Sequence, residues 1–239
     1  MSSPTTHISA NLDAVRQRIQ HAAAASGRNP DTIRLIAVSK YMPEGDVRQA
    51  IQAGQQCFGE NTLQDAQSKQ TLIDEQATEW HFIGHLQSNK AKHIPGNFGW
   101  LHTLDNLKLA KKLSAVAAGS GKTLRVLLQV NIANDPDKFG LPSTTLFRFI
   151  DDLLSADLDS LKVCGLMMIG HRGATSTERR RDFSALYELG HQCAGRFGAG
   201  LFDEYSMGMS SDFEDAIAEG ATMIRVGSAI FGPRPQNGP

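Results

Sequence analysis

A lysine, Lys40, directly follows the apolar run Ile33–Ser39, so a primary amine lies where a buried strand is expected to end. Partial burial disfavours the charged form of an amine, and the neutral amine is the nucleophile that condenses with an aldehyde. Charged residues also commonly end strands and point to water. The chemistry of Lys40 therefore depends on what the fold places beside it.

Two clusters of small and polar residues, Ser206–Ser211 and Arg225–Gly232, could bind an anion. Small residues let the backbone approach an anion closely, and Ser206, Ser210 and Ser228 offer hydroxyl donors. The competing interpretation is turn and helix-cap chemistry. We assign Ser211 mainly to a capping box with Glu214, at the start of a helix that ends at Gly220.

Arg225 interrupts the apolar run Met223–Val226 with a permanent charge, and a buried charge needs a partner. An ion pair with Asp203 or Glu204 on the neighbouring strand would satisfy it. A ligand lying across the end of the strand would also do so. An aldehyde-bearing phosphate compound joined to Lys40, held at its phosphate by the two clusters and backed by Arg225, describes pyridoxal phosphate.

Eight apolar strand candidates alternate with amphipathic helix patterns. They are Ile33–Ser39, Gln56–Gly59, Trp80–Gly84, Trp100–Leu104, Leu124–Ile132, Leu161–Ile169, Leu201–Ser206 and Thr222–Val226. This alternation indicates a parallel sheet covered by helices. We predict one α/β domain over residues 1–239, a (β/α)8 TIM barrel preceded by an extra helix from about Asn11 to Gly27, with its site at the carboxyl ends of the strands. An open doubly wound sheet is the structural alternative.

Composition narrows the function further. The formal net charge is −1 and the densest basic run, Arg179-Arg180-Arg181, lies in a helix pattern, so we expect no nucleic-acid surface. No segment approaches the length of a membrane span, and the first residues lack a signal-peptide pattern, so we expect a cytoplasmic protein. Three widely spaced cysteines predict free thiols, two of them buried, and neither a disulfide framework nor a metal site.

Five stretches together resemble the pyridoxal phosphate homeostasis protein family, single-barrel relatives of the alanine racemase N-terminal domain. They are Ala37–Lys40, Phe58–Asn61, Trp80–Lys90, Ser206–Ser210 and Arg225–Gly232, and they span nearly the whole chain. The resemblance implies pyridoxal phosphate as cofactor, with Lys40 joined to its aldehyde and Asn61 near its ring. It also implies that Ser206, Ser210, Gly227 and Ser228 hold the phosphate with Met209 alongside, and that Arg225 faces the pyridine nitrogen. It assigns no role to the loop after Ile169 or to Lys138.

An arginine at the pyridine nitrogen disfavours a protonated ring, which makes the cofactor a weaker electron sink. Alanine racemases also supply a tyrosine base from a second domain, for which we expect no room before Pro239. We therefore predict a largely non-catalytic, monomeric carrier or buffer of pyridoxal phosphate that supplies apo-enzymes. A racemase or lyase using the same cofactor, with Tyr41 or a histidine as base, is the alternative, and a Schiff-base aldolase is a less favoured one.

Overall fold

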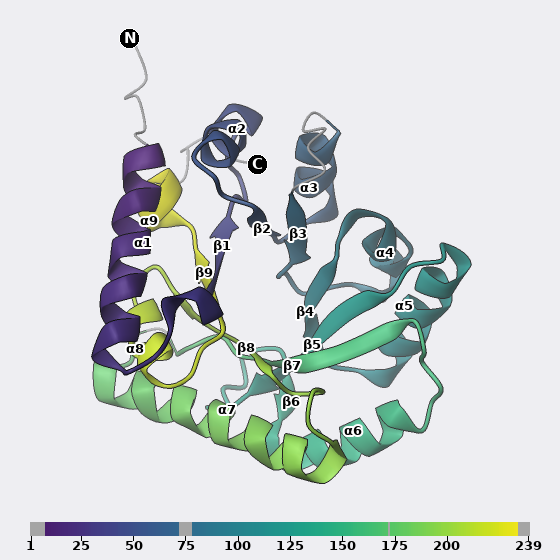
Figure 1. Ribbon diagram of the computed structural model, residues 1–239. Coiled ribbons are helices and arrows are strands. Elements are labelled where there is room, and N and C mark those ends of the chain that lie inside the picture. Colours follow the sequence, from purple (N-terminus) through teal and green to yellow (C-terminus); the bar gives the residue numbers. More distant parts are fainter. Residues whose placement is uncertain (1–7, 72–77, 172, 234–239) are drawn as a thin grey trace.

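The computed structural model describes residues 8–71, 78–171 and 173–233, in which strands and helices alternate (Figure 1). The strands are β1 (Arg34–Val38), β2 (Cys57–Glu60), β3 (Glu79–Phe82), β4 (Trp100–Leu104), β5 (Leu124–Asn131), β6 (Leu141–Pro142), β7 (Leu161–Met167), β8 (Glu204–Met209) and β9 (Met223–Val226). The α-helices are α1 (Ile8–Ala25), α2 (Glu44–Gln52), α3 (Leu63–Gln70), α4 (Ile94–Asn97), α5 (Leu107–Gly119), α6 (Leu146–Leu154), α7 (Ser176–Phe197), α8 (Phe213–Ala218) and α9 (Ser228–Phe231). Short 3-10 helices are η1 (Pro30–Thr32), η2 (Ser88–His93) and η3 (Ser143–Thr145).

The strands form a closed parallel ring. Its order is β4-β3-β2-β1-β9-β8-β7-β5, and the pairing of β4 with β5 closes it. The two-residue β6 is an addition to β5 outside this ring. Parallel neighbours need crossover connections, and the helices that make them surround the ring (Figure 1). The predicted (β/α)8 barrel is confirmed, and the open sheet is excluded.

Side chains alternate between the two faces of each strand. One set packs between the strands and the helices in a large apolar core. The other set fills the inside of the barrel with a smaller apolar cluster, Ile36, Trp100, Leu127, Cys164, Met167 and Met223. Several other buried residues on the strands are polar, among them His81, His102, Ser206 and Arg225. The interior of the barrel therefore carries hydrogen-bonding groups as well as apolar packing.

The extra N-terminal helix is present as α1, which begins at Ile8 rather than near Asn11. Its buried face lies against α8, α9 and α2 (Figure 1). Asn11 donates from Nδ2 to the carbonyl of Ile230 at 2.8 Å, and Arg28 donates to the carbonyls of Ile217 and Ala221. These bonds attach α1 to the segments on either side of β9.

Strand β8 lies further along the chain than predicted. It spans Glu204–Met209, whereas the apolar pattern predicts Leu201–Ser206. Leu201 and Phe202 instead pack in the outer core before the strand begins, with Phe202 against Phe197 at the end of α7. The correction moves Ser206 from the end of the strand into its interior.

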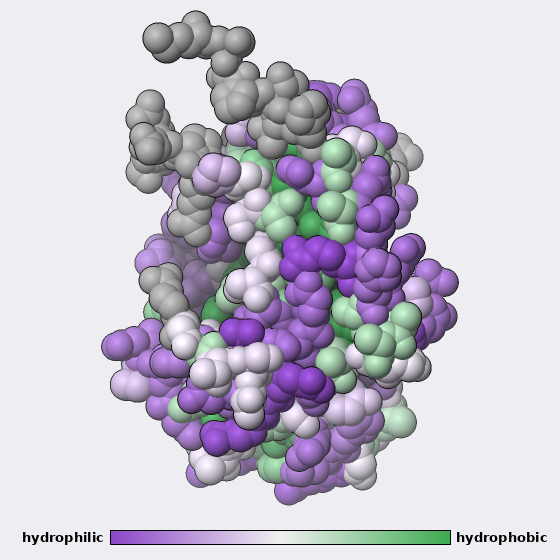
Figure 2. All heavy atoms as spheres, turned by 90° about the vertical axis from the view of Figure 1, so that its left-hand side faces the viewer, coloured by the Kyte–Doolittle hydropathy of each residue, from purple (hydrophilic) through white to green (hydrophobic). Residues whose placement is uncertain are grey.

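Figure 2 views the side where α1 and α8 lie and shows hydrophilic residues over most of that face. Within the described residues, none of the helices is long and apolar enough to span a bilayer. All three cysteines are free thiols, as predicted. The buried pair differs from the one that the strand patterns indicate, Cys57 and Cys164, because Cys164 and Cys193 are buried and Cys57 is half-buried.

Replacing Gly84 by alanine should lower the free energy of unfolding by about 2 kcal/mol, the middle of the range for an overpacked site. A Cβ at Gly84 would lie 2.2 Å from the carbonyl oxygen of Asn61, so the loops after β2 and β3 would have to separate. Gly96→Ala is the matched control, because a Cβ there meets nothing within 4 Å. Urea unfolding of both variants provides the measurement, and equal stabilities would contradict the close approach.

Candidate functional site

A cavity of about 380 Å³ opens at the carboxyl ends of the strands. Its volume is in the range of small-molecule sites. The residues that line it come from most of the ring: Val38, Lys40, Met42, Asn61, Ile83, Met167, Ile169, Met209, Ser210, Ser211, Arg225, Gly227, Ser228 and Gly232. Seven of the eight predicted site residues are among them, and the exception is Ser206.

Lys40 lies two residues beyond β1, half-buried, with its neighbour Ser39 fully buried. A buried cation, Lys69 on α3, donates from Nζ to the carbonyl of Ser39 at 2.6 Å. Asp65 accepts from the backbone N–H of Tyr41 at 2.7 Å. The backbone is thus held on both sides of Lys40, and Tyr41 adopts a left-handed conformation with φ of 65°. Such a conformation is unfavourable for a non-glycine residue and needs support of this kind.

The support is a buried ionic cluster of Lys69, Glu60 and Asp65. Lys69 Nζ lies 2.7 Å from Glu60 Oε1 and 2.9 Å from Asp65 Oδ1, and Ser39 Oγ donates to the same Glu60 oxygen. Burial raises the pKa of Glu60 to about 7, although Lys69 and Ser39 oppose that rise. The pKa of Asp65 lies below its usual value. Burial acts to raise this pKa, but hydrogen bonds from Lys69 and from the backbone N–H of Tyr41 act in the opposite direction and outweigh it.

Arg225 contributes a permanent charge to the floor of the cavity. Its side chain is buried, and it donates to Ser206 Oγ at 2.5 Å and to the carbonyl of Met168 at 2.8 Å. Burial lowers its pKa to about 10, partly offset by the charge of Asp212, so the guanidinium stays protonated near neutral pH. The ion pair with Asp203 or Glu204, one of the two alternatives for Arg225, is not formed among the described residues, and Glu204 instead lies 3.5 Å from Arg34 and accepts from Thr222.

An anion cradle lies where β8 and β9 end. The backbone N–H of Gly227 donates to Ser210 Oγ at 3.1 Å, which brings the two loops together. Gly208, with φ of 88°, lies within β8 where its pairing with β9 shifts register, and a Cβ there would lie 2.6 Å from Ala216 in α8. Ser228 is exposed at the rim. Hydroxyls and small residues at one place suit a phosphate group.

The capping box predicted at Ser211 is wrong. Helix α8 begins at Phe213 with Asp212 as its N-cap, and Asp212 accepts from the backbone N–H of Met209 at 2.6 Å. Ser211 instead lines the cavity. The true capping box lies at Thr175 and Glu178, at the start of α7.

Asn61 and several apolar side chains form the walls. Asn61 follows β2 and lies next to Gly84, whose missing side chain makes room for it. Val38, Met42, Ile83 and Met167 also line the cavity, so a flat ring would meet apolar surfaces there.

Ser206 occupies a different place from the one predicted. It lies within β8, fully buried beneath the cavity, and its hydroxyl contacts Arg225 and His102 Nδ1. The phosphate-binding role predicted for it does not fit this position. Ser211 takes a place at the cavity that the sequence patterns did not indicate.

Two further side chains join loops around the mouth. Lys138 donates from Nζ to the carbonyl of Gly170 at 3.1 Å, which joins the loop after β5 to the loop after β7. His85 stacks on Phe139 with a centroid distance of 3.6 Å. Phe139, Tyr41 and Ile169 are exposed apolar residues, so part of the rim is apolar.

The barrel fold and the residues at its mouth define the structural class of the protein. The family model of the alanine racemase N-terminal domain matches residues 10–235 of this chain. The fold is therefore the barrel of that class.

Three relatives narrow the class to one family. The chain is 40% identical over 232 residues to the pyridoxal phosphate homeostasis protein of Pseudomonas aeruginosa, covering 97% of this chain and 98% of that protein. It is 41% identical over 238 residues to the Escherichia coli K12 protein of the same name, covering 95% and 97%. The structure of PipY from Synechococcus elongatus PCC7942 with pyridoxal phosphate bound matches with a TM-score of 0.80 at 36% identity, covering 90% of this chain and 100% of that one. The chain belongs to the pyridoxal phosphate homeostasis protein family.

The elevated pKa of Glu60 predicts a pH-dependent stability. The pKa rises from 4.5 to about 7 on folding, so the stabilising effect is full below about pH 4.5 and is lost as pH rises through about 7. Glu60→Gln keeps an acceptor for Ser39 and Lys69 but cannot ionise, and it should remove about 1–3 kcal/mol of this pH dependence. Urea unfolding at several pH values measures it. Glu188→Gln on the exposed side of α7 is the control, and an unchanged slope in Glu60→Gln would contradict the assignment.

Proposed function

We propose that this protein binds pyridoxal phosphate at the barrel mouth, carries or buffers it, and performs little or no catalysis on it. The observation that supports this most is that one cavity brings together the amine of Lys40, the guanidinium of Arg225 and the cradle of Ser210, Gly227 and Ser228. The cofactor bound to the related PipY structure gives independent support. The recipients would be apo-enzymes that use the same cofactor.

The lining residues fit the cofactor part by part. The amine of Lys40 would condense with the aldehyde, forming a carbon–nitrogen double bond and releasing one water. The hydroxyls of Ser210 and Ser228 would hold the phosphate, with Met209 alongside. Asn61 and Arg225 would face the ring and its nitrogen. Apolar walls would cover the ring faces.

The ionisable groups at the cavity argue against efficient proton transfer. When bound, the cofactor supplies an electron sink for carbanion chemistry. Among the described residues that line the cavity, only Lys40 and Arg225 have ionisable side chains. A guanidinium does not act as a base near neutral pH, and it cannot give the ring nitrogen a proton without losing its own charge. Lys40 is thus the one group in the lining suited to move a proton, whereas racemisation needs a group on each face.

A racemase or lyase remains the competing function because of Tyr41. This tyrosine follows Lys40 directly, is 39% exposed at the mouth and is held in a left-handed conformation. It does not line the cavity among the described residues, which favours the carrier.

Lys40→Ala should abolish the yellow chromophore of the purified protein, because no other lysine lines the cavity among the described residues. Absorption spectra after adding the cofactor test this, with the exposed Lys111→Ala as a control that keeps the chromophore. Borohydride reduction and peptide mass mapping should locate the adduct at Lys40. A colourless wild type, or an adduct at another lysine, would overturn the proposal.

Solvent deuterium exchange at Cα of amino acids separates the carrier from the enzyme. We expect the loaded protein to exchange no faster than free cofactor at the same concentration, because the cavity lining lacks a second proton-transfer group. Exchange well above free cofactor that Tyr41→Phe abolishes would establish the racemase or lyase instead. The measurement is made by NMR, with Lys40→Ala as the background.

A further inference from the structure

A chain of hydrogen-bonded side chains runs through the barrel interior beneath the cavity. Arg225 donates to Ser206 Oγ at 2.5 Å, and Ser206 Oγ lies 2.9 Å from His102 Nδ1. His102 Nε2 lies 2.9 Å from His81 Nδ1, and His81 Nε2 lies 3.3 Å from Glu79 Oε2. Ser206, His102 and His81 are fully buried. We call these five residues the buried polar chain.

The contact between His81 and Glu79 is the longest in the buried polar chain, and the surroundings of His81 Nε2 show how to interpret it. At 3.3 Å it falls short of good hydrogen-bond geometry, but His81 Nε2 is buried and has no other partner among the described residues. The Glu79 oxygen is thus the acceptor available to it. The contact with His81 is also the main reason why the pKa of Glu79 falls to about 2, with Arg125 adding to the effect.

The carboxylate end of the buried polar chain fixes the direction of its hydrogen bonds. Glu79 can only accept, so a neutral His81 carries its proton on Nε2, towards that carboxylate, and its Nδ1 is an acceptor. His102 must then carry its proton on Nε2 and donate to His81 Nδ1. The bare Nδ1 of His102 accepts the Ser206 proton, and the Ser206 oxygen accepts from Arg225, which can only donate. Any other order would place two donors or two acceptors face to face.

This order of donors and acceptors aligns the dipoles of Ser206, His102 and His81. The aligned dipoles lie between the positive charge of Arg225 and the negative charge of Glu79. Each neutral member accepts from the side of Arg225 and donates towards Glu79, so the negative end of the series faces the guanidinium. Hydrogen bonds in series polarise one another in a low-dielectric interior. Burial lowers the pKa of both histidines, which keeps them neutral.

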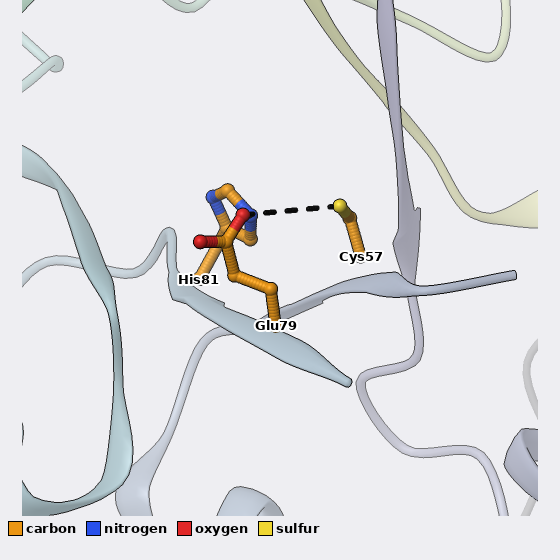
Figure 3. A group of neighbouring side chains, drawn as sticks. All are labelled: Cys57, Glu79 and His81. Carbon is orange, nitrogen blue, oxygen red and sulfur yellow. Dashed lines mark hydrogen bonds and ion pairs between the residues drawn. The ribbon is translucent and has the colours of Figure 1, made fainter. Parts of the chain in front are cut away.

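The lower end of the buried polar chain lies at the amino ends of β2 and β3, where Cys57 joins Glu79 and His81 (Figure 3). Their ligand atoms lie within 4.8 Å of one another, the spacing of a metal site. Arg125 forms an ion pair with Glu79, and the charges of Arg34 and Arg125 act on Cys57. A cation would have to displace or approach these guanidiniums, so the carboxylate is better explained as the anchor of the buried polar chain.

We propose that His102 and His81 are positioning residues for Arg225. Through Ser206 they present a fixed lone pair to the guanidinium, and so hold its plane and charge at the floor of the cavity. The effect on the cofactor rests on the proposed function, whereas the order of the hydrogen bonds belongs to the chain alone. The hydrogen-bond order and the effect on the cofactor can therefore be disproved independently of each other.

The hydrogen-bond order is tested on the cofactor-free protein by NMR with 15N-labelled histidine. His81 and His102 should both be neutral with the proton on Nε2, and should stay so between about pH 5 and 8, where an unperturbed histidine changes charge. The His102→Gln variant assigns the signals, and His21 on α1 serves as a solvent-exposed reference. A proton on Nδ1, or an imidazolium signal, at either residue would overturn the proposal whatever the cofactor does.

The effect on the site is tested by cofactor titration of the full chain. His102→Phe removes the acceptor for Ser206, and Ser206→Ala removes the link to Arg225 with little change of volume. Each should weaken pyridoxal phosphate binding roughly tenfold, the loss expected for a hydrogen bond to a charged group, and should alter the pH profile of the chromophore. His102→Gln, whose amide both accepts and donates, should retain most of the affinity, and His21→Phe should retain all of it.

The double variant gives the sharpest outcome. Because both substitutions break one chain, Ser206→Ala with His102→Phe should bind no more weakly than either alone. Additive losses, or wild-type affinity and pH profile in both single variants, would refute positioning. A wild type that binds no cofactor would refute the proposed function instead, and the NMR result would still decide the hydrogen-bond order.

Discussion

The site depends on one buried positive charge. Arg225 is only 5% exposed, and among the described residues no carboxylate lies within ion-pair distance of it. A buried charge without a direct counterion is costly and persists only with good hydrogen bonds. Ser206 and the carbonyl of Met168 provide them, and Asp212 provides a distant opposite charge. Under the proposed function, a ligand at the cavity gives this charge its role.

Lys40, which follows the neighbouring strand β1, is held in place in a different way from Arg225. Lys40 has a long, adaptable side chain, but its backbone is held by Lys69 at Ser39 and by Asp65 at Tyr41. Fixing the backbone limits where the amine can reach. Lys69 is thus a structural cation, buried and committed to Glu60 and Asp65. Lys40 is the lysine that lines the cavity.

The sequence predicts site residues best where a charged residue interrupts or directly follows an apolar run. Lys40 and Arg225 stand out because each places a charge in or beside an apolar run, and alternating apolar strands and helices predict the barrel. The position of Ser206 was predicted wrongly because Leu201 and Phe202 continue an apolar pattern that belongs to outer packing rather than to β8. Two groups of contacting side chains could not be predicted, because no local sequence pattern indicates them. The Lys69 cluster arises where α3 returns to β1 and β2, and the His81–His102 contact depends on how β3 pairs with β4.

The floor and the rim of the cavity differ in their exposure to solvent, and this difference bears on the proposed role of the protein. Arg225 and its partners Ser206 and Met168 are buried, whereas Lys40 is half-buried and Ser228 is exposed at the rim. Release of a covalently held aldehyde requires a water molecule at the carbon–nitrogen bond, so a carrier needs that bond near solvent. A catalyst that stabilises carbanions benefits from the opposite, a closed site that excludes water. A rigid, charged floor with an accessible amine would therefore favour holding and releasing the cofactor over using it.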